Sequence, residues 1–63
     1  MRVLFKSNSY AVVELTQLDR QTLGTGSSFG VVDTFYEKVP LLKNMVGTFV
    51  TAEEAEDWAR DHE

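Results

Sequence analysis

The stretch that decides the fold is residues 51–62, TAEEAEDWARDH. Four of its side chains recur at i, i+3, i+4 and i+7, the spacing that places residues on one face of an α-helix. They are Ala55, Trp58, Ala59 and His62. Thr51 is a suitable N-cap, and Glu54 three residues later completes the pattern of a capping box. The sequence therefore predicts a helix over residues 52–62 that packs on a sheet through Trp58.

Four β-prone segments precede this helix. They span residues 2–6, 10–15, 29–36 and 45–50. The first two are expected to form a hairpin around the polar turn at residues 7–9, and one long bent strand is the alternative. The predicted fold class is α+β: one small domain over residues 1–63, with a three- or four-stranded antiparallel sheet and the C-terminal helix packed on one face.

Residues 16–28 allow two interpretations. Leu15, Leu18 and Leu23 could line one side of a short helix that stops at Gly24. Alternatively, residues 24–28, GTGSS, could form the tip of a long, mobile hairpin loop. We favour an irregular loop.

Size and composition limit the class of protein. A chain of 63 residues buries roughly 60% of its unfolded surface, and without cysteine it can use neither a disulfide nor a thiolate metal site. No apolar run approaches the roughly 20 residues that span a bilayer. No signal peptide begins the chain, so we expect a soluble, cytoplasmic protein without membrane contact.

The net charge of −4 is concentrated in the last segment. Residues 51–63 carry six acidic side chains against Arg60 alone. Glu53, Asp57 and Asp61 recur every four residues as an acidic ridge, while Glu56 is expected to pair with Arg60. Such a face either keeps a small protein soluble or recognises a basic partner. The predicted partner-binding residues are Glu53, Glu54, Glu56, Asp57 and Asp61.

A second candidate contact is apolar. It consists of Val39, Leu41, Leu42 and Met45, which stand around Pro40 in a connecting segment. We expect these side chains to close the core, and the alternative is a contact with a partner or a second copy.

Catalytic and metal chemistry find no support in the sequence. The single histidine, His62, stands at the frayed end of the helix, and no serine has an identifiable base. The carboxylates of the helix point around its axis instead of converging on a cation. We therefore expect no enzyme activity, no cofactor and no metal.

Two resemblances suggest functions. The order of strands and helix, with residues 49–55, FVTAEEA, leading into the helix, resembles the arm-type DNA-binding domains of phage integrases over about residues 10–62. Those domains lay their sheet in the major groove, which here would use five basic side chains. They are Arg2, Lys6, Arg20, Lys38 and Lys43.

By size and charge the chain also resembles the small acidic inhibitors of phages and mobile elements, such as anti-CRISPR proteins and other DNA mimics. The expected function is a non-enzymatic interaction module, an inhibitor that presents its acidic helix to a basic, nucleic-acid-binding protein. The alternatives are a sheet-face DNA-binding domain of the integrase-arm kind and a homodimeric accessory domain. Direct nucleic-acid binding is not expected, because no basic stripe is present.

Overall fold

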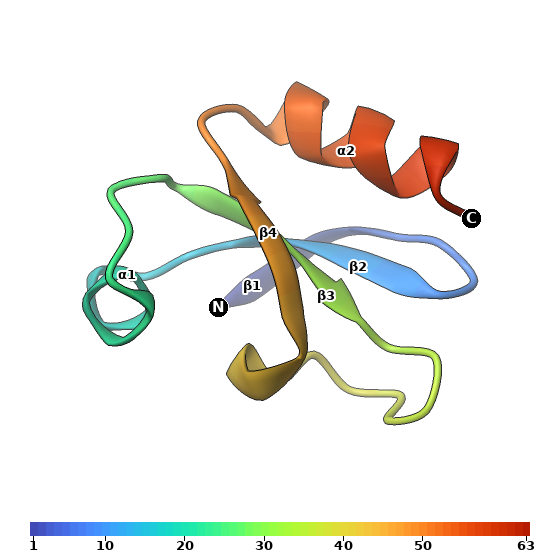
Figure 1. The fold of residues 1–63 in the computed structure, drawn as a ribbon, viewed down its shortest axis with the longest axis horizontal. Coiled ribbons are helices and arrows are strands. Elements are labelled where there is room, and N and C mark those ends of the chain that lie inside the picture. The colour runs from blue at the N-terminus through green and yellow to red at the C-terminus, as the bar shows by residue number, and fades with distance from the viewer.

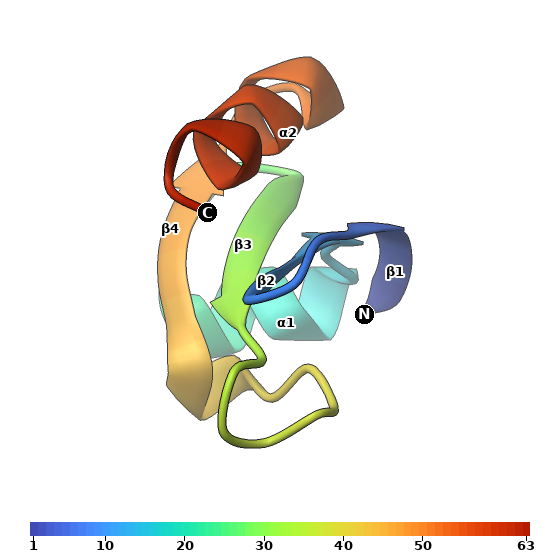
Figure 2. The ribbon, with the colours of Figure 1, turned by 90° about the vertical axis from the view of Figure 1, so that its right-hand side faces the viewer.

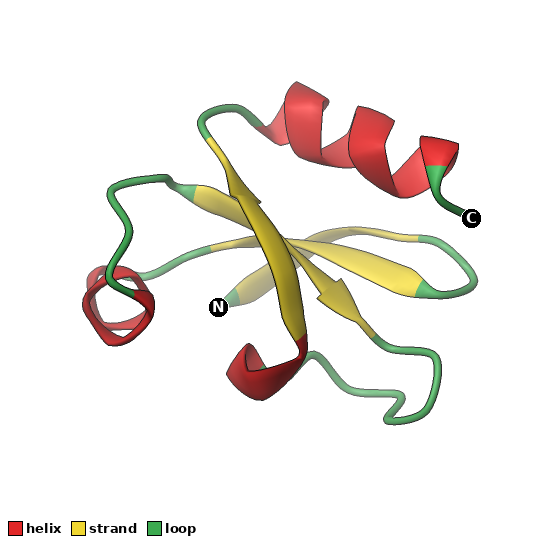
Figure 3. Cartoon of the chain, in the orientation of Figure 1, coloured by secondary structure: helices red, strands yellow, loops and turns green.

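Four antiparallel strands and two α-helices make up the fold in the computed structural model, which describes residues 1–63 (Figure 1). In spatial order the strands are β1 (Arg2–Lys6), β2 (Tyr10–Glu14), β3 (Phe29–Asp33) and β4 (Met45–Phe49). The helical elements are α1 (Gln17–Leu23), the 3-10 turn η1 (Leu42–Asn44) and α2 (Ala52–Asp61) (Figure 3). The predicted α+β class, with a C-terminal helix packed on an antiparallel sheet, is confirmed.

The central strands β2 and β3 are buried on both faces. Consecutive residues of a strand point to opposite sides, so the fully buried run Ala11–Val13 contributes to two different cores. The same holds for Val31 and Val32 of β3. Val31 lies opposite Val12 and Val32 lies opposite Ala11. One apolar pair therefore faces each side of the sheet.

The helix α2 covers the first of these two faces. Ala55 and Ala59 are fully buried against Val12 and Val31, because their small side chains let the helix approach the strands closely. Trp58 packs at the margin of this core. Its ring centroid lies 5.1 Å from that of Tyr10, in an edge-to-face arrangement, and 6.4 Å from that of Phe49.

The opposite face of the sheet is also covered. The sequence predicted a helix on one face only and did not predict this second cover. Val13 and Leu15 are buried there beside Ala11 and Val32, and Met1, Leu23 and Met45 pack over them. Figure 2 shows α2 above β2 and α1 below it. The sheet is thus the middle layer of the molecule.

The loop favoured for residues 16–28 is wrong over Gln17–Leu23, where the alternative, a short helix, is present. Its C-cap is Gly24 in the left-handed conformation (φ 71°), with its N–H directed at the carbonyls of Arg20 and Gln21. The proposed leucine face is only partly correct. Leu15 is buried and Leu23 half-buried, but Leu18 is 70% exposed.

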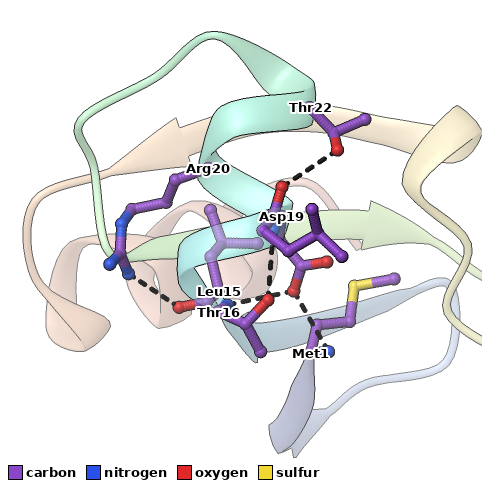
Figure 4. Close-up of polar contacts among 7 residues, drawn as sticks. Met1, Leu15, Thr16, Asp19, Arg20 and Thr22 are labelled. Atoms are coloured by element: carbon purple, nitrogen blue, oxygen red, sulfur yellow. Dashed lines mark hydrogen bonds and ion pairs between the residues drawn. The ribbon is translucent and has the colours of Figure 1, made fainter.

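A complete capping box begins α1, drawn in Figure 4. The Asp19 N–H donates to Thr16 Oγ1 at 3.1 Å, and Asp19 Oδ2 accepts the Thr16 N–H at 3.0 Å. The amino nitrogen of Met1 lies 3.1 Å from the same Asp19 oxygen, and Arg20 Nη1 donates to the Leu15 carbonyl at 2.9 Å. These polar contacts fasten a helix that has no buried residue of its own.

The box predicted at the start of α2 is only half formed. Thr51 Oγ1 accepts the Glu54 N–H at 3.2 Å, as expected of an N-cap. The Glu54 carboxylate, however, accepts from the Thr51 hydroxyl at 3.1 Å instead of from the Thr51 backbone. The helix still begins where the sequence predicted, because the N-cap contact alone satisfies a free amide.

Residues 2–14 form the predicted hairpin and not one bent strand, with a turn closed by a 2.8 Å bond from the Ser7 N–H to the Tyr10 carbonyl. The third strand ends at Asp33, three residues earlier than predicted. Asp33 Oδ1 accepts the Phe35 N–H at 2.9 Å, which turns the chain out of the sheet. Irregularities in the pairing of both edge strands add to the twist, and β4 crosses β1 steeply in Figure 1.

Replacement of Trp58 by alanine is expected to destabilise the fold by about 3 kcal/mol, the low end for a tryptophan because the side chain is half-buried. A chain of this length has only roughly 3–9 kcal/mol of stability. Urea denaturation followed by circular dichroism measures the loss. Trp58→Phe retains the contacts with Tyr10 and Phe49 and should lose much less. A wild-type midpoint for Trp58→Ala would contradict this packing.

The stability of the fold should depend on Asp19 in a defined pH range. The Thr16 amide, followed by the Met1 ammonium, holds the pKa of Asp19 below its ordinary 3.8. A depressed pKa stabilises the folded state above the unfolded value, and this stabilisation is lost as the pH falls through the folded value. Asp19→Asn should therefore lower the melting temperature at pH 6, and its difference from the wild type should shrink below pH 3.8. Asp61→Asn controls for the loss of one charge. A difference that stays constant with pH would refute the assignment.

Candidate functional site

The five predicted acidic residues lie together on α2. Glu53, Glu54, Asp57 and Asp61 are exposed and Glu56 is half-buried. They point outward because Ala55 and Ala59 fix the opposite side of the helix in the core. Figure 1 shows this helix along the outside of the molecule, with one side turned away from every strand. The acidic side chains therefore form one accessible face, which we call the α2 acidic face.

Arg60 is paired differently from the sequence expectation. Its guanidinium lies 2.6 Å from Asp57 and 3.9 Å from Glu56, so Asp57 is the closer partner. The hydrogen bond to Asp57 raises the pKa of Arg60. Arg60 thus neutralises Asp57, the central residue of the acidic ridge. Glu53 and Asp61, at the two ends of the ridge, have no basic partner. The strongest uncompensated charge sits at the two ends of the face.

The C-terminal turn of α2 is held by stacking. The His62 ring lies parallel to the Trp58 ring, 3.9 Å between centroids, and His62 Nδ1 donates to the Trp58 carbonyl at 2.8 Å. Glu63 accepts the Asn8 N–H at 3.0 Å, which ties the chain end to the β1–β2 turn. The only histidine therefore caps the C-terminal end of α2 and stacks on Trp58.

The four residues of the apolar candidate contact differ in burial. Met45 packs on the core beneath the sheet, and Leu41 and Leu42 are half-buried. Val39 is 58% exposed. The expectation that this segment closes the core thus fits Met45, whereas the side chain of Val39 is exposed to solvent.

A pair of exposed aromatic rings follows β3, in a place where the sequence predicted a continuing strand. Phe35 is 53% and Tyr36 is 86% exposed. The two rings contact each other edge to face at 4.9 Å, and the Lys38 ammonium lies 5.5 Å from the centroid of Phe35. This pair was missed because its aromatic composition is also typical of a strand.

A small open hollow adjoins these rings. It has a volume of about 110 Å³ and is lined by Asp33, Tyr36, Glu37 and Asn44. Glu37 Oε1 lies 3.4 Å from Asn44 Nδ2 and 3.3 Å from Lys43 Nζ. The hydrogen bond from Asn44, followed by that from Lys43, lowers the pKa of Glu37. Its carboxylate is therefore charged at neutral pH.

The basic side chains are dispersed and engaged. Arg2 pairs with Glu14 at 2.9 Å, and Lys43 pairs with Glu37. Lys6 donates to the Lys38 carbonyl at 3.3 Å. No stripe of free cations runs along either face of the sheet.

Comparison with protein-family models, with curated proteins and with solved structures finds no match for this chain. None of its helices combines the length and apolar character needed to cross a membrane. No three His, Cys, Asp or Glu side chains are grouped closely enough to hold a metal ion.

Proposed function

We propose that this chain is a non-enzymatic protein-interaction module that binds a basic partner through the α2 acidic face. The observation that supports this most directly is the asymmetry of α2. One side of the helix is fully buried, and the other presents five carboxylates with a single arginine among them. Solubility alone would be served equally well by acidic side chains dispersed over the surface.

The density of charge on α2 suits a partner that ordinarily binds nucleic acid. Five carboxylates are spread over a helix of ten residues. With Arg60 subtracted, and at about 1.5 Å per residue, this is one net negative charge per ~4 Å, near the ~3.4 Å per phosphate along one DNA strand. A basic groove shaped for phosphates would therefore meet a similar linear charge.

The cytoplasm is the setting that we propose, because a cysteine-free chain needs no oxidising compartment.

The face is rigid enough to be recognised without ordering on binding. Thr51 caps the first turn, His62 closes the last, and two alanines lock the axis against β2 and β3. Preorganisation of this kind reduces the entropy lost on association. Complementary charge also accelerates encounter with a basic partner at low salt.

Sheet-face DNA binding, the alternative suggested by integrase arms, draws less support. One face of the sheet lies under α2, and the other lies under Met1, Leu23 and Met45. The two central strands contribute no basic side chain. A domain built this way leaves exposed sheet residues mainly on its edge strands, such as Val3, Leu4 and Val46.

Two variants of equal net charge test the proposal, with polylysine as the basic probe. Glu53→Gln/Asp61→Asn removes two of the three carboxylates of the α2 acidic face that have no basic partner, one at each end. Glu14→Gln/Glu63→Gln removes carboxylates that contact Arg2 and Asn8 instead. At low salt the first variant should bind about fivefold more weakly by calorimetry, since two exposed charge contacts are worth roughly 1 kcal/mol in total. The second should remain near wild type.

Equal losses in the two variants would contradict the proposal, because they would report net charge and not a site. Reversal to lysine at Glu53, Asp57 and Asp61 should abolish binding altogether. Circular dichroism verifies that this triple variant is folded, as expected for substitutions confined to exposed positions.

A further inference from the structure

The hollow at the end of β3 lies on a different part of the molecule from the α2 acidic face. In Figure 1 the segment after β3 is at the lower right, whereas α2 is at the top. Its volume of about 110 Å³ is well below the ~300–1,000 Å³ of pockets for drug-sized ligands. The space therefore suits the end of one side chain rather than a metabolite or cofactor.

Two of the four lining residues are carboxylates with capacity to accept hydrogen bonds. Asp33 Oδ1 accepts the Phe35 N–H at 2.9 Å, and its second oxygen has no partner in the protein. Glu37 uses Oε1 for Asn44 and Lys43 and leaves Oε2 free. Asp33 ends β3 and Glu37 belongs to the segment that follows, and both carboxylates line the same hollow. The arrangement favours a compact cation with several N–H donors.

The aromatic lining adds a surface for the same kind of group. Tyr36 is supported mainly by its edge-to-face contact with Phe35 and is otherwise in solvent. Exposed tyrosines beside a concave site are typical anchors of protein interfaces. The face of such a ring attracts an ammonium group electrostatically.

Two lysines of the chain make contacts of both kinds, with a ring and with a carboxylate, in the same region. The Lys38 ammonium lies 5.5 Å from the centre of the Phe35 ring. The Lys43 ammonium lies 3.3 Å from the Glu37 carboxylate, and its side chain is 68% exposed. Glu37 of the lining, and Phe35 next to Tyr36, are thus each already in contact with an ammonium of the chain itself. Because Lys43 is paired with Glu37, an incoming cation would compete with it for that carboxylate.

We propose that this hollow binds the ammonium group of an unmodified lysine side chain from a partner protein. An arginine fork matches one carboxylate bidentately, whereas a lysine ammonium can donate separately to Asp33 and Glu37. A trimethylated lysine has no N–H and would leave both carboxylates without a donor. The inference uses no residue of α2, so it stands or falls separately from the proposed function.

Titration of ¹⁵N-labelled protein with N-acetyl-lysine methylamide tests the site by NMR. The amide signals of residues 33–37 and Asn44 should shift with a millimolar dissociation constant. The norleucine analogue has the same alkyl chain without the ammonium and should not shift them. The trimethyl-lysine analogue should bind more weakly than lysine. Shifts of equal size with norleucine, or tighter binding of trimethyl-lysine, would overturn the proposal.

Substitutions assign the binding to individual groups. Asp33→Asn keeps an acceptor for the Phe35 amide but removes the charge, and should weaken binding about fivefold. Tyr36→Leu should weaken it about two- to fivefold through loss of the ring face. Lys43→Gln removes the competitor and should strengthen it about twofold. Unchanged affinity in Asp33→Asn would refute the site.

Two controls separate this site from the α2 acidic face. Glu14→Gln loses one charge elsewhere and should bind the lysine probe as the wild type does. Glu53→Gln/Asp61→Asn should also retain full binding of this probe. Loss of binding in that double variant would place the lysine on α2 and overturn the assignment to the hollow.

Discussion

Burial of the β2–β3 pair on both faces is the constraint on which the rest of the structure depends. Val12 and Val31 face α2, while Ala11 and Val32 face the opposite side. A shift of the register by one residue would exchange the two sets and place every contact on the wrong side. Each remaining element covers part of this pair. The edge strands flank it, α2 lies over one face, and α1 with the start of β4 lies over the other.

Small side chains at the centre explain how so short a chain can build two cores. Valine and alanine keep the layers close together, so that few residues are needed to exclude water from both faces. The large rings of Tyr10, Phe49 and Trp58 lie at the margin, where they close the gap between sheet and helix. The stability of the fold is therefore shared between contacts of small side chains at the centre and contacts of aromatic rings around them. The charged exterior of α2 contributes little to packing and is free to vary with function.

The sequence predicted best those features that depend on local chemistry. The start of α2 follows from Thr51, and its inner face follows from the spacing of Ala55 and Ala59. The helix α1 was weighed but not favoured, because it spans seven residues, buries none of them and has Asp19 at the third position of its capping box, where Glu or Gln is usual. The early end of β3 depends on one side-chain contact, Asp33 to the Phe35 amide, which composition does not reveal. The hollow was beyond sequence reasoning, because its lining combines the end of β3, the following loop and η1.

The two proposed surfaces carry the same sign of charge but would act over different ranges. Carboxylates spread along α2 generate a field that extends about 8 Å at physiological salt, and that field can attract any basic surface with little demand on geometry. The hollow combines carboxylates with a ring within a space for one side chain, so as a binding site it would discriminate between kinds of cation at contact distance. Long-range attraction by the α2 acidic face would speed association but add little specificity. A pocket for one lysine side chain would add specificity but little affinity. A basic partner that engaged both surfaces would be bound with the advantages of each, because the rigid sheet between them fixes their separation. That rigidity is a direct result of the two-sided core, so the packing of the central strands would determine how both proposed surfaces meet a partner.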